Sequence, residues 1–340
     1  MYLKIKHNFA IMQVIEPDKL FNVKSEEEFN NLALEVFNFQ YRHNKLYNGF
    51  VSQFSIKTEK INHYSQIPFL PIEFFKTHEV ICGERKKSEI IFTSSSTSSQ
   101  IPSRHIVKDI SIYEKSFLKG FEYFYGNPAD YVIIALLPNY LERGQSSLVF
   151  MFSKLIELSK KSESGFYTND YSKLKNVVTE LKNRNQKTIL IGVTYALLDL
   201  AEQNIELSDN FIVMETGGMK GRREELLKEE LDHLLKEKLG VNTIHSEYGM
   251  TELLSQAYSK GSGEFKCVPW MKIVIRDIED PLSWAKQNKT GGINIIDLAN
   301  INSCSFIATH DLGRINANGK FELMGRFDNT DIRGCNLMVE

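Results

Sequence analysis

Cysteine is scarce in this chain of 340 residues, which has four: Cys82, Cys267, Cys304 and Cys335. No two of them have the C-x-x-C spacing that is typical of structural zinc sites and of redox-active dithiols. The pattern gives no indication of either kind of site. So few, scattered cysteines favour a protein of the reducing cytoplasm.

The sequence also lacks an excess of charge of either sign. Its 41 Lys and Arg and 43 Asp and Glu leave a formal net charge of −2. Binding to nucleic acid or to an anionic membrane surface normally needs a basic patch, and the overall charge indicates neither. A neutral small substrate or a protein partner is consistent with this composition.

Long apolar runs are missing as well. No segment approaches the ~20 apolar residues of a membrane-spanning helix. Residues 1–21 have no sustained apolar run and no small-residue cleavage site, so we expect no signal peptide. Hydrophobic residues still make up 42% of the chain, enough for a sizeable core in one large domain or two.

Apolar runs of strand length alternate with amphipathic segments, which predicts a mixed α/β fold. Residues 131–137 are one such run of strand length, and residues 188–193 and 211–214 are continuous and β-branched, as in buried parallel strands. The clearest helix is predicted over 222–239, and Gly240 would end it. Five leucines form its apolar stripe: Leu226, Leu227, Leu231, Leu234 and Leu235.

The last quarter of the chain changes to short alternating strands, with turns predicted at 288–292 and 318–319. We found no internal repeat and no linker long enough to separate domains. The predicted organisation is an α/β core over residues 1–270, a β-rich subdomain over 271–325, and a hinge and short tail over 326–340.

A hydroxyl-rich segment follows a predicted strand that begins at Ile90, and a helix is predicted from about Ile106 onward. It follows Thr93 directly and contains six candidate phosphate ligands: Ser94, Ser95, Ser96, Thr97, Ser98 and Ser99. Such a turn supplies the hydroxyl donors that, together with backbone N–H groups, bind phosphate. An ordinary surface loop is the alternative.

The most specific short motif is YGMTE, which begins at Tyr248. From one turn, the Tyr248 ring could stack on adenine, Gly249 could allow close backbone approach, and Thr251 could donate to a phosphate. Glu252 could coordinate Mg²⁺. A bare pentapeptide of this kind is also compatible with an ordinary loop.

Asp311 and Arg326 complete a candidate ATP site as residues that could grip a ribose. Asp311 follows a predicted strand at 306–309, where its carboxylate could accept both ribose hydroxyls. Turn capping is the alternative role. Gly217 and Gly218 lie between a predicted strand and a predicted helix, where α/β folds often hold a ligand, although a tight turn also explains them.

This ordered set resembles the adenylate-forming superfamily of acyl and aryl ligases. It is more closely similar to the acyl-protein synthetase subunit of bacterial luminescence fatty-acid reductases. That similarity is carried by ETGGMKGR at 215–222, HSEYGMTEL at 245–253, PWMK at 269–272 and IRGCNL at 332–337, and it covers most of the chain.

The resemblance implies an adenylate-forming large domain, with mixed and parallel sheets flanked by helices. It also implies a small β-rich C-terminal subdomain and a truncated or absent mobile C-terminal domain. The hydroxyl-rich segment would be the phosphate loop, and Gly217 and Gly218 would shape the adenine slot. Ser96 and Ser99 stand where the family usually has glycine, which permits closer backbone approach.

His245 and Cys335 are the candidate nucleophiles. A lone histidine such as His245 is more often a packed, hydrogen-bonded residue than a catalyst. Cys335 lies near Arg333, a cation that favours the thiolate, although a free cysteine is usually a small buried hydrophobe. The luminescence synthetases carry an acyl group on a cysteine near the C-terminus, and Cys335 is the only one so placed here.

The predicted function is ATP- and Mg²⁺-dependent activation of a carboxylic acid, expected to be a fatty acid, to an acyl-adenylate. Transfer to a thiol would follow, and the resemblance implies an acyl-CoA reductase-like protein as the next acceptor. Two alternatives stay open. One is a CoA ligase of the aryl-acid, phenylacetate type; the other is a degenerate nucleotide-binding subunit, which Ser96 and Ser99 favour.

Overall fold

The computed structural model describes residues 15–87, 89–94, 101–137, 145–168, 170–217 and 226–327. All structural statements concern these residues. Several predicted site residues lie outside them: Ser95, Ser96, Thr97, Ser98, Ser99, Gly218 and Cys335.

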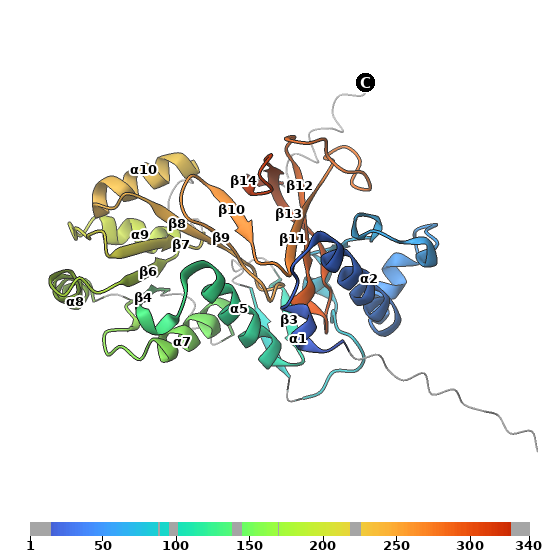
Figure 1. The fold of residues 1–340 in the computed structure, drawn as a ribbon, viewed down its shortest axis with the longest axis horizontal. Coiled ribbons are helices and arrows are strands. Elements are labelled where there is room, and N and C mark those ends of the chain that lie inside the picture. Colours follow the sequence, from blue (N-terminus) through green and yellow to red (C-terminus); the bar gives the residue numbers. More distant parts are fainter. Residues whose placement is uncertain are drawn as a thin grey trace, which may run out of the picture.

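Five parallel strands form one half of the main sheet (Figure 1). They are β4 (Val132–Leu136), β5 (Gly165–Phe166), β6 (Thr188–Gly192), β7 (Phe211–Glu215) and β8 (Ile244–Tyr248). The continuous apolar runs at β6 and β7 were predicted as buried parallel strands, and this is confirmed; the strand-length run at β4 pairs in parallel with β6. Strands of this kind are apolar on both faces because helices cover both.

The other half of the sheet is almost entirely antiparallel. Its strands are β9 (Ala257–Ser259), β10 (Glu264–Cys267), β11 (Met271–Arg276), β12 (Gly291–Asp297), β13 (Phe306–Ile315) and β14 (Phe321–Arg326). The short strand β1 (Leu70–Pro71) pairs in parallel with β13. The full strand order is β11-β12-β13-β14-β10-β9-β8-β7-β6-β4-β5. Because β10 pairs with β14, one continuous sheet includes strands from both sides of the predicted boundary at residue 270. The predicted division into domains stays a prediction.

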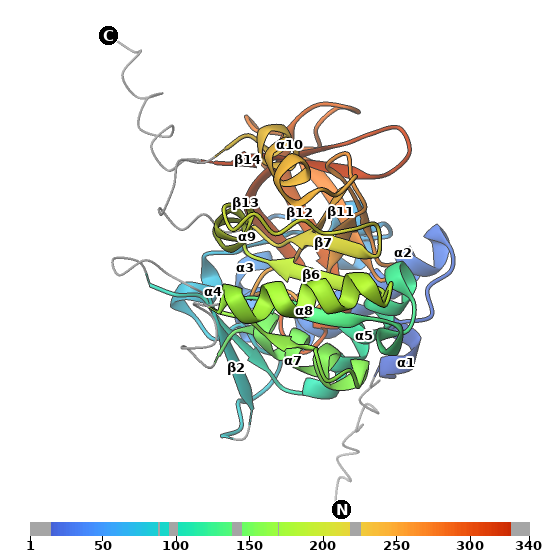
Figure 2. The same ribbon diagram turned by 90° about the vertical axis from the view of Figure 1, so that its left-hand side faces the viewer.

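Helices cover both faces of the parallel strands. They are α5 (Ile110–Tyr125), α7 (Ser147–Ser159), α8 (Tyr171–Asn183), α9 (Thr194–Ala201) and α10 (Lys228–Leu239). In Figure 1, α9 and α10 lie above the parallel strands, and α7, with α5 beside it, lies below them. In Figure 2, α8 is the helix nearest the viewer, outside the parallel strands. The predicted mixed α/β fold is confirmed.

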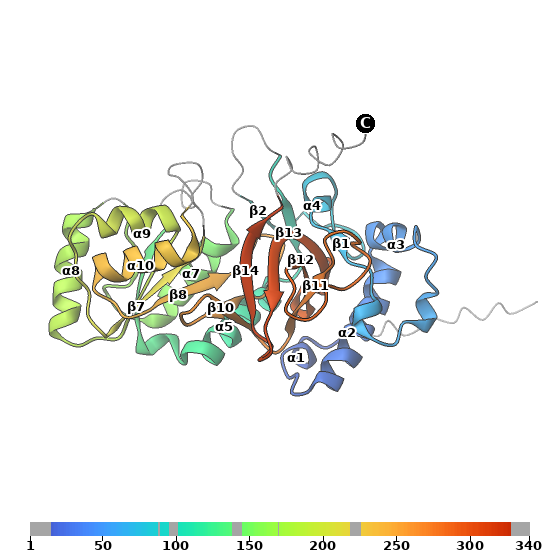
Figure 3. The ribbon, with the colours of Figure 1, turned by 90° about the horizontal axis from the view of Figure 1, so that it is seen from above.

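The N-terminal part packs against the antiparallel strands, so that β13 and β14 lie between two helical regions (Figure 3). Its helices are α1 (Pro17–Leu20), α2 (Glu26–His43), α3 (Lys45–Val51) and α4 (Phe74–Thr77). The described residues also form four short 3-10 helices. Two lie in this N-terminal part, η1 (Thr58–Lys60) and η2 (Tyr64–Gln66), and two lie later in the chain, η3 (Pro128–Asp130) and η4 (Leu298–Asn300). Phe37 of α2 and Tyr47 of α3 contact Phe306 of β13 in the core.

The helix predicted from Ile106 onward begins later. Residues before it form β3 (Arg104–Val107), which pairs with β2 (Ile90–Thr93) in a separate two-stranded sheet. Helix α5 starts only after Asp109, whose side chain accepts from the Ser111 N–H as an N-cap. The long-range pairing with β2 overrides the local helical pattern at 106–107.

The leucine stripe predicted for 222–239 is partly wrong. Leu231 and Leu235 are buried on α10, but Leu226 and Leu227 precede the helix and are 39% and 71% exposed. Gly240 ends the helix with φ +68°, as predicted, because a left-handed residue at this position favours glycine. The predicted turn at 318–319 is also present, with Gly319 at φ +78°. Of the turn predicted at 288–292, Gly291 and Gly292 already belong to β12.

No helix in the described ranges is long and apolar enough to span a bilayer.

Substitution of Gly291 tests how tightly the antiparallel half is packed. A Cβ at Gly291, the first residue of β12, would collide with the backbone carbonyl of Arg276 on β11. We expect Gly291→Ala to lower the free energy of unfolding by about 1–3 kcal/mol. Gly49→Ala is the matched control, since nothing lies within 4 Å of a Cβ in α3. Urea unfolding should show no loss, or a gain, for the control; equal losses would contradict the close packing.

Candidate active site

Tyr248, Asp311 and Arg326 meet where β8, β13 and β14 come together. The Tyr248 hydroxyl donates to Asp311 Oδ2 at 2.8 Å, and Arg326 Nε donates to Asp311 Oδ1 at 2.8 Å. Asp311 is 6% exposed, whereas the Arg326 side chain is largely exposed. The Asp311 carboxylate raises the pKa of Arg326 above its ordinary value. The structure therefore brings together three predicted site residues that are far apart in sequence.

Asp311 was predicted to lie at the end of a strand, but the structure places it inside one. Strand β13 continues to Ile315, and Asp311 pairs directly with Arg326 of β14. The cross-strand ion pair follows from this register, because directly opposed side chains lie on the same face of a sheet. Strand pairing, which is not local, extends the strand beyond the apolar run at 306–309.

The Tyr248 ring is packed inside the protein. It is 7% exposed and makes edge-on contacts with Phe265 and Phe321, with ring centroids 6.0 and 5.5 Å away. Burial, followed by the nearby Asp311 carboxylate, raises the pKa of Tyr248 well above its ordinary value. The hydroxyl therefore stays protonated and donates to Asp311. Stacking of this ring on adenine stays a prediction.

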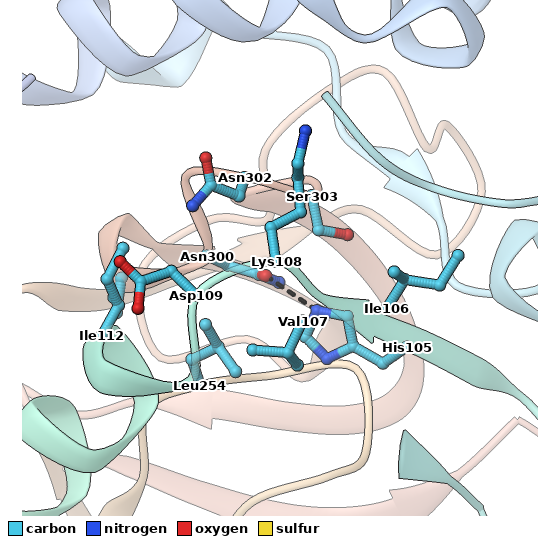
Figure 4. Close-up of a pocket in the computed structure, with 11 residues that line it drawn as sticks. His105, Ile106, Val107, Lys108, Asp109, Ile112, Leu254, Asn300, Asn302 and Ser303 are labelled. Carbon is cyan, nitrogen blue, oxygen red and sulfur yellow. Dashed lines mark hydrogen bonds between the residues drawn. The ribbon is translucent and has the colours of Figure 1, made fainter. Parts of the chain in front are cut away.

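The backbone carbonyls of Thr251 and Glu252 are held by two buried side chains. His105 Nδ1 lies 2.8 Å from Thr251 O, and Asn300 Nδ2 donates to Glu252 O at 2.8 Å. Asn300 Nδ2 also donates to Cys304 O, which leaves Asn300 Oδ1 facing His105 Nε2 at 3.0 Å (Figure 4). These contacts connect β3, η4 and the YGMTE turn.

His105 faces two acceptors with one proton to donate. Burial lowers the pKa of His105 to about 4, so the ring is neutral near pH 7. A neutral imidazole carries a single N–H, whereas Thr251 O and Asn300 Oδ1 are both acceptors. While the His105 ring is neutral, it can therefore donate a hydrogen bond to only one of these two acceptors. A cavity of about 10 Å³ lies beside the ring, at the lower size limit for one water molecule.

Glu252 is linked to the hydroxyl-rich segment through Ser103. The Glu252 carboxyl is 5% exposed and is hydrogen-bonded by the Ser103 side chain, and burial raises its pKa. The Ser103 N–H donates to Ser94 Oγ at 2.9 Å, and the Ser94 N–H donates to Ser103 O at 3.1 Å. The first residue of the predicted phosphate loop is therefore held close to the predicted metal ligand.

A magnesium ion fits Glu252 only in company with a nucleotide. Among the described residues, no group of three or more His, Cys, Asp and Glu could hold a metal ion. Mg²⁺ often takes one or two carboxylates and completes its coordination with water and substrate phosphates. A single buried carboxylate beside the predicted phosphate loop is a donor set of that kind.

Gly217 lies just beyond the carboxyl end of β7. Its φ of +72° is in the left-handed region that favours glycine, although nothing lies within 4 Å of a Cβ there. Glu215 Oε1 accepts from the Gly217 N–H at 2.5 Å and from the Thr194 hydroxyl at 2.6 Å. Backbone conformation rather than lack of space therefore accounts for this glycine.

Glu247, one residue before Tyr248, is a buried carboxyl that sequence reasoning missed. Burial and the nearby Glu215 raise the pKa of Glu247 to about 8, so the group is neutral at pH 7. A Cβ at Gly249 would overlap Glu247 Oε1, so a larger residue there would require the buried Glu247 side chain to move. The signal available in the sequence was an acidic residue inside a strand-length segment, residues 244–248.

His245 on the same strand is a packed, hydrogen-bonded residue. Its Nδ1 lies 3.2 Å from the Tyr125 hydroxyl on α5. Burial, with a smaller effect of Lys260, lowers the pKa of His245 to about 4. Nothing in this arrangement indicates a nucleophile.

Titration of Glu247 should appear in stability. The native state keeps the proton up to pH about 8, whereas an unfolded glutamate loses it near its ordinary pKa of 4.5. The native state thus binds more protons across this window, and the free energy of unfolding falls as pH rises through it. We expect Glu247→Gln to remove this fall, and so to gain a few kcal/mol relative to wild type between pH about 5 and 8.5.

Urea unfolding at several pH values measures this difference. Glu122→Gln, an exposed position on α5, is the control and should differ from wild type by the same amount at every pH. A difference between Glu247→Gln and wild type that does not change with pH would show that Glu247 is ionised in the folded protein.

Comparisons with known proteins identify the family and the fold. The chain matches the family described as acyl-protein synthetase, LuxE, over residues 14–340. A comparison with curated proteins gave no match.

Solved structures show the same fold. An open 2-hydroxyisobutyryl-CoA ligase in complex with 2-HIB-AMP and CoA has a TM-score of 0.66 and 11% identity, covering 89% of this chain and 70% of that one. ATP-bound MatB from Rhodopseudomonas palustris has a TM-score of 0.54 and 16% identity, covering 72% of this chain and 50% of that one. The chain thus spans half of MatB and somewhat more of the other ligase. At these identities the likeness shows the fold, and the family match, which covers nearly the whole chain, places this protein in the LuxE family of acyl-protein synthetases.

Proposed function

We propose that this protein activates a carboxylic acid with ATP and passes the acyl group to a thiol. The observation that supports this most directly is the meeting of Tyr248, Asp311 and Arg326 beside the turn that carries Thr251 and Glu252. Membership of the acyl-protein synthetase family supports the same reaction. ATP is the proposed cofactor, in line with the ATP-bound ligase of the same fold.

Asp311 would bind the ribose of ATP. Each of its carboxylate oxygens already accepts one hydrogen bond, from Tyr248 or from Arg326. Each oxygen keeps a further lone pair, so both can still accept from ribose hydroxyls. Tyr248 and Arg326 hold the carboxylate in place, while Gly217 and Gly218 would shape the adenine slot.

In the first step, a carboxylate oxygen of the acid attacks the α-phosphorus, and the bond from that phosphorus to pyrophosphate breaks. Thr251 would donate to the α-phosphate, and the segment from Ser94 to Ser99 would bind the departing phosphates. Mg²⁺ held by Glu252 and the phosphates would neutralise charge on the leaving group. In the second step, a thiolate attacks the acyl carbon and AMP leaves.

The thiol acceptor in this proposal is Cys335. Burial raises the pKa of Cys82 and Cys267 to about 12, and it raises the pKa of Cys304 further still. None of these three is a thiolate near neutral pH, so none is suited to attack an acyl-adenylate. Transfer from Cys335 to an acyl reductase would then follow.

We also propose that the protein acts in the cytoplasm, and we expect a fatty acid as its substrate.

Loss of Glu252 or Asp311 should abolish acid activation. Glu252→Gln weakens Mg²⁺ binding, and Asp311→Ala removes the ribose acceptor; each should slow acid-dependent ATP–pyrophosphate exchange by ~10²-fold or more. Glu122→Gln should exchange at the wild-type rate. A panel of aliphatic and aromatic acids identifies the substrate class. Wild-type exchange in both folded site variants would refute the assigned site, and no exchange by wild type would favour a non-catalytic nucleotide-binding subunit.

Replacement of Cys335 separates this enzyme from an ordinary CoA ligase. Cys335→Ser should keep pyrophosphate exchange, because adenylate formation does not use the thiol. It should lose the hydroxylamine-sensitive label obtained from radioactive acid and ATP, because a serine hydroxyl stays protonated and is a poor nucleophile. Cys267→Ser is the control and should label normally. Full labelling of Cys335→Ser would point to direct transfer to an external thiol such as CoA.

A further inference from the structure

A buried ion-pair cluster lies under the Gly217 turn and is not used in the proposed reaction. Lys228, the first residue of α10, places its Nζ 3.2 Å from Glu215 Oε2 and 2.9 Å from Asp232 Oδ1. The side chains of Glu215 and Asp232 are only 9% and 12% exposed. Two nearly buried carboxylates therefore share one ammonium group.

Glu215 connects Lys228 to the residues at the carboxyl ends of the parallel strands. We call this side of the sheet, where the proposed ATP site lies, the ligand edge. While Oε2 faces Lys228, Oε1 accepts from the Gly217 N–H and from the Thr194 hydroxyl. The carboxylate thus joins the start of α10, the start of α9 and the left-handed residue Gly217. Movement of Lys228 would change the position of the Gly217 N–H through two short contacts.

The helix itself does not favour a lysine at the first position of α10. The N-terminus of a helix carries partial positive charge, which disfavours a cation and favours the acidic residues Glu229 and Glu230 that follow. Burial also opposes the charge on Lys228, yet the pKa of Lys228 is raised because Glu215 and Asp232 outweigh that effect. The carboxylates, rather than the helix, account for the lysine.

The cluster also borders Glu247. The Glu215 carboxylate is close enough to raise the pKa of Glu247, which lies next to Tyr248. Lys228 is therefore a cation that compensates the negative charge of Glu215 and Asp232 near the ends of β7 and β8. Its removal would leave Glu215 and Asp232 buried and without their common partner, a change that is usually costly.

We propose that Lys228 is a positioning residue for the nucleotide: through Glu215 it holds the Gly217 turn in the conformation that binds the adenosine part of ATP. This inference rests on the proposed function, because it assigns Gly217 to the adenine slot. It assigns to Lys228 no contact with phosphate or acid. The effect of changing Lys228 should therefore appear in the use of ATP and not in the use of the acid.

Three variants test this role in the full chain. Lys228→Met removes the charge but keeps a long side chain, Lys228→Arg keeps the charge, and Lys238→Met alters an exposed lysine of the same helix. We expect Lys228→Met to raise the KM for ATP in pyrophosphate exchange ~10-fold, as loss of a charged hydrogen bond implies. The KM for the acid and kcat should stay within about 2-fold. Lys228→Arg should recover most of the ATP affinity, and Lys238→Met should match wild type.

Thermal unfolding of each variant separates positioning from general damage. Equal rises in both KM values, or a loss of kcat alone in a folded Lys228→Met protein, would overturn the proposal. If Lys228→Met does not fold, Glu215→Gln takes its place, since it keeps an oxygen for Gly217 and weakens the tie to Lys228. An unchanged KM for ATP in that variant would also overturn the proposal.

A second measurement distinguishes failure of the proposed function from failure of the role proposed for Lys228. If wild type shows no exchange with any acid, equilibrium binding of a fluorescent ATP analogue replaces the KM measurement. Weaker binding by Lys228→Met than by wild type and Lys238→Met would then support the positioning role without catalysis. Equal binding by all three proteins, or no binding by wild type, would overturn it.

Discussion

The buried carboxylate of Asp297 is the interaction on which the arrangement of the candidate site depends. Asp297 is fully buried and accepts from the backbone N–H groups of Leu254, Ser255 and Ala299 and from the Ser255 hydroxyl. Burial raises the pKa of Asp297 to about 6, so these four donors hold an ionised group at neutral pH. A charge in the interior is tolerated only with such full hydrogen bonding.

This carboxylate and its neighbour Asn300 fix the whole segment after Tyr248. Asp297 holds residues 254 and 255, and three residues further along the chain Asn300 holds the Glu252 carbonyl. Trp270 adds to the same region, because its Nε1 donates to Ser255 Oγ and to Ser116 Oγ of α5 at 3.0 Å. Residues 249–255, which follow β8 and form no helix or strand, are thus held by side-chain hydrogen bonds from β3, from η4 and from the end of β12.

Local features of the site could be predicted from sequence, whereas the polar network that supports them could not. The strand leading to Gly217 is a continuous apolar run, and Gly240 and Gly319 have positive φ values that local turn patterns predict. His105, by contrast, contacts residues 146 and 195 positions away. Nothing in the residues around His105 signals those partners.

Misplaced elements have the same physical origin. Residues 104–107 form a strand because β2 is available to pair with them, and β13 extends past Asp311 because β14 lies alongside. A periodic apolar pattern measures how a segment would bury itself alone, and it contains no term for a distant hydrogen-bonding partner. Residues whose role is defined by such partners, including Ser103, Glu247 and Lys228, are therefore found only from the structure.

Charge balance at the ligand edge limits how a nucleotide can be held there. Two cations of the described residues near this edge, Lys228 and Arg326, are already paired with Glu215 and Asp311, and a third, Lys76, acts on the Glu252 carboxyl. Glu247 and His105 are neutral at pH 7 because burial disfavours their charged forms. In the proposed reaction, the described residues would therefore offer a triphosphate mainly hydroxyl and backbone N–H donors, with charge neutralised by its own metal ion. In such a site the positions of dipoles decide affinity, and a buried network that fixes those positions is part of the binding energy.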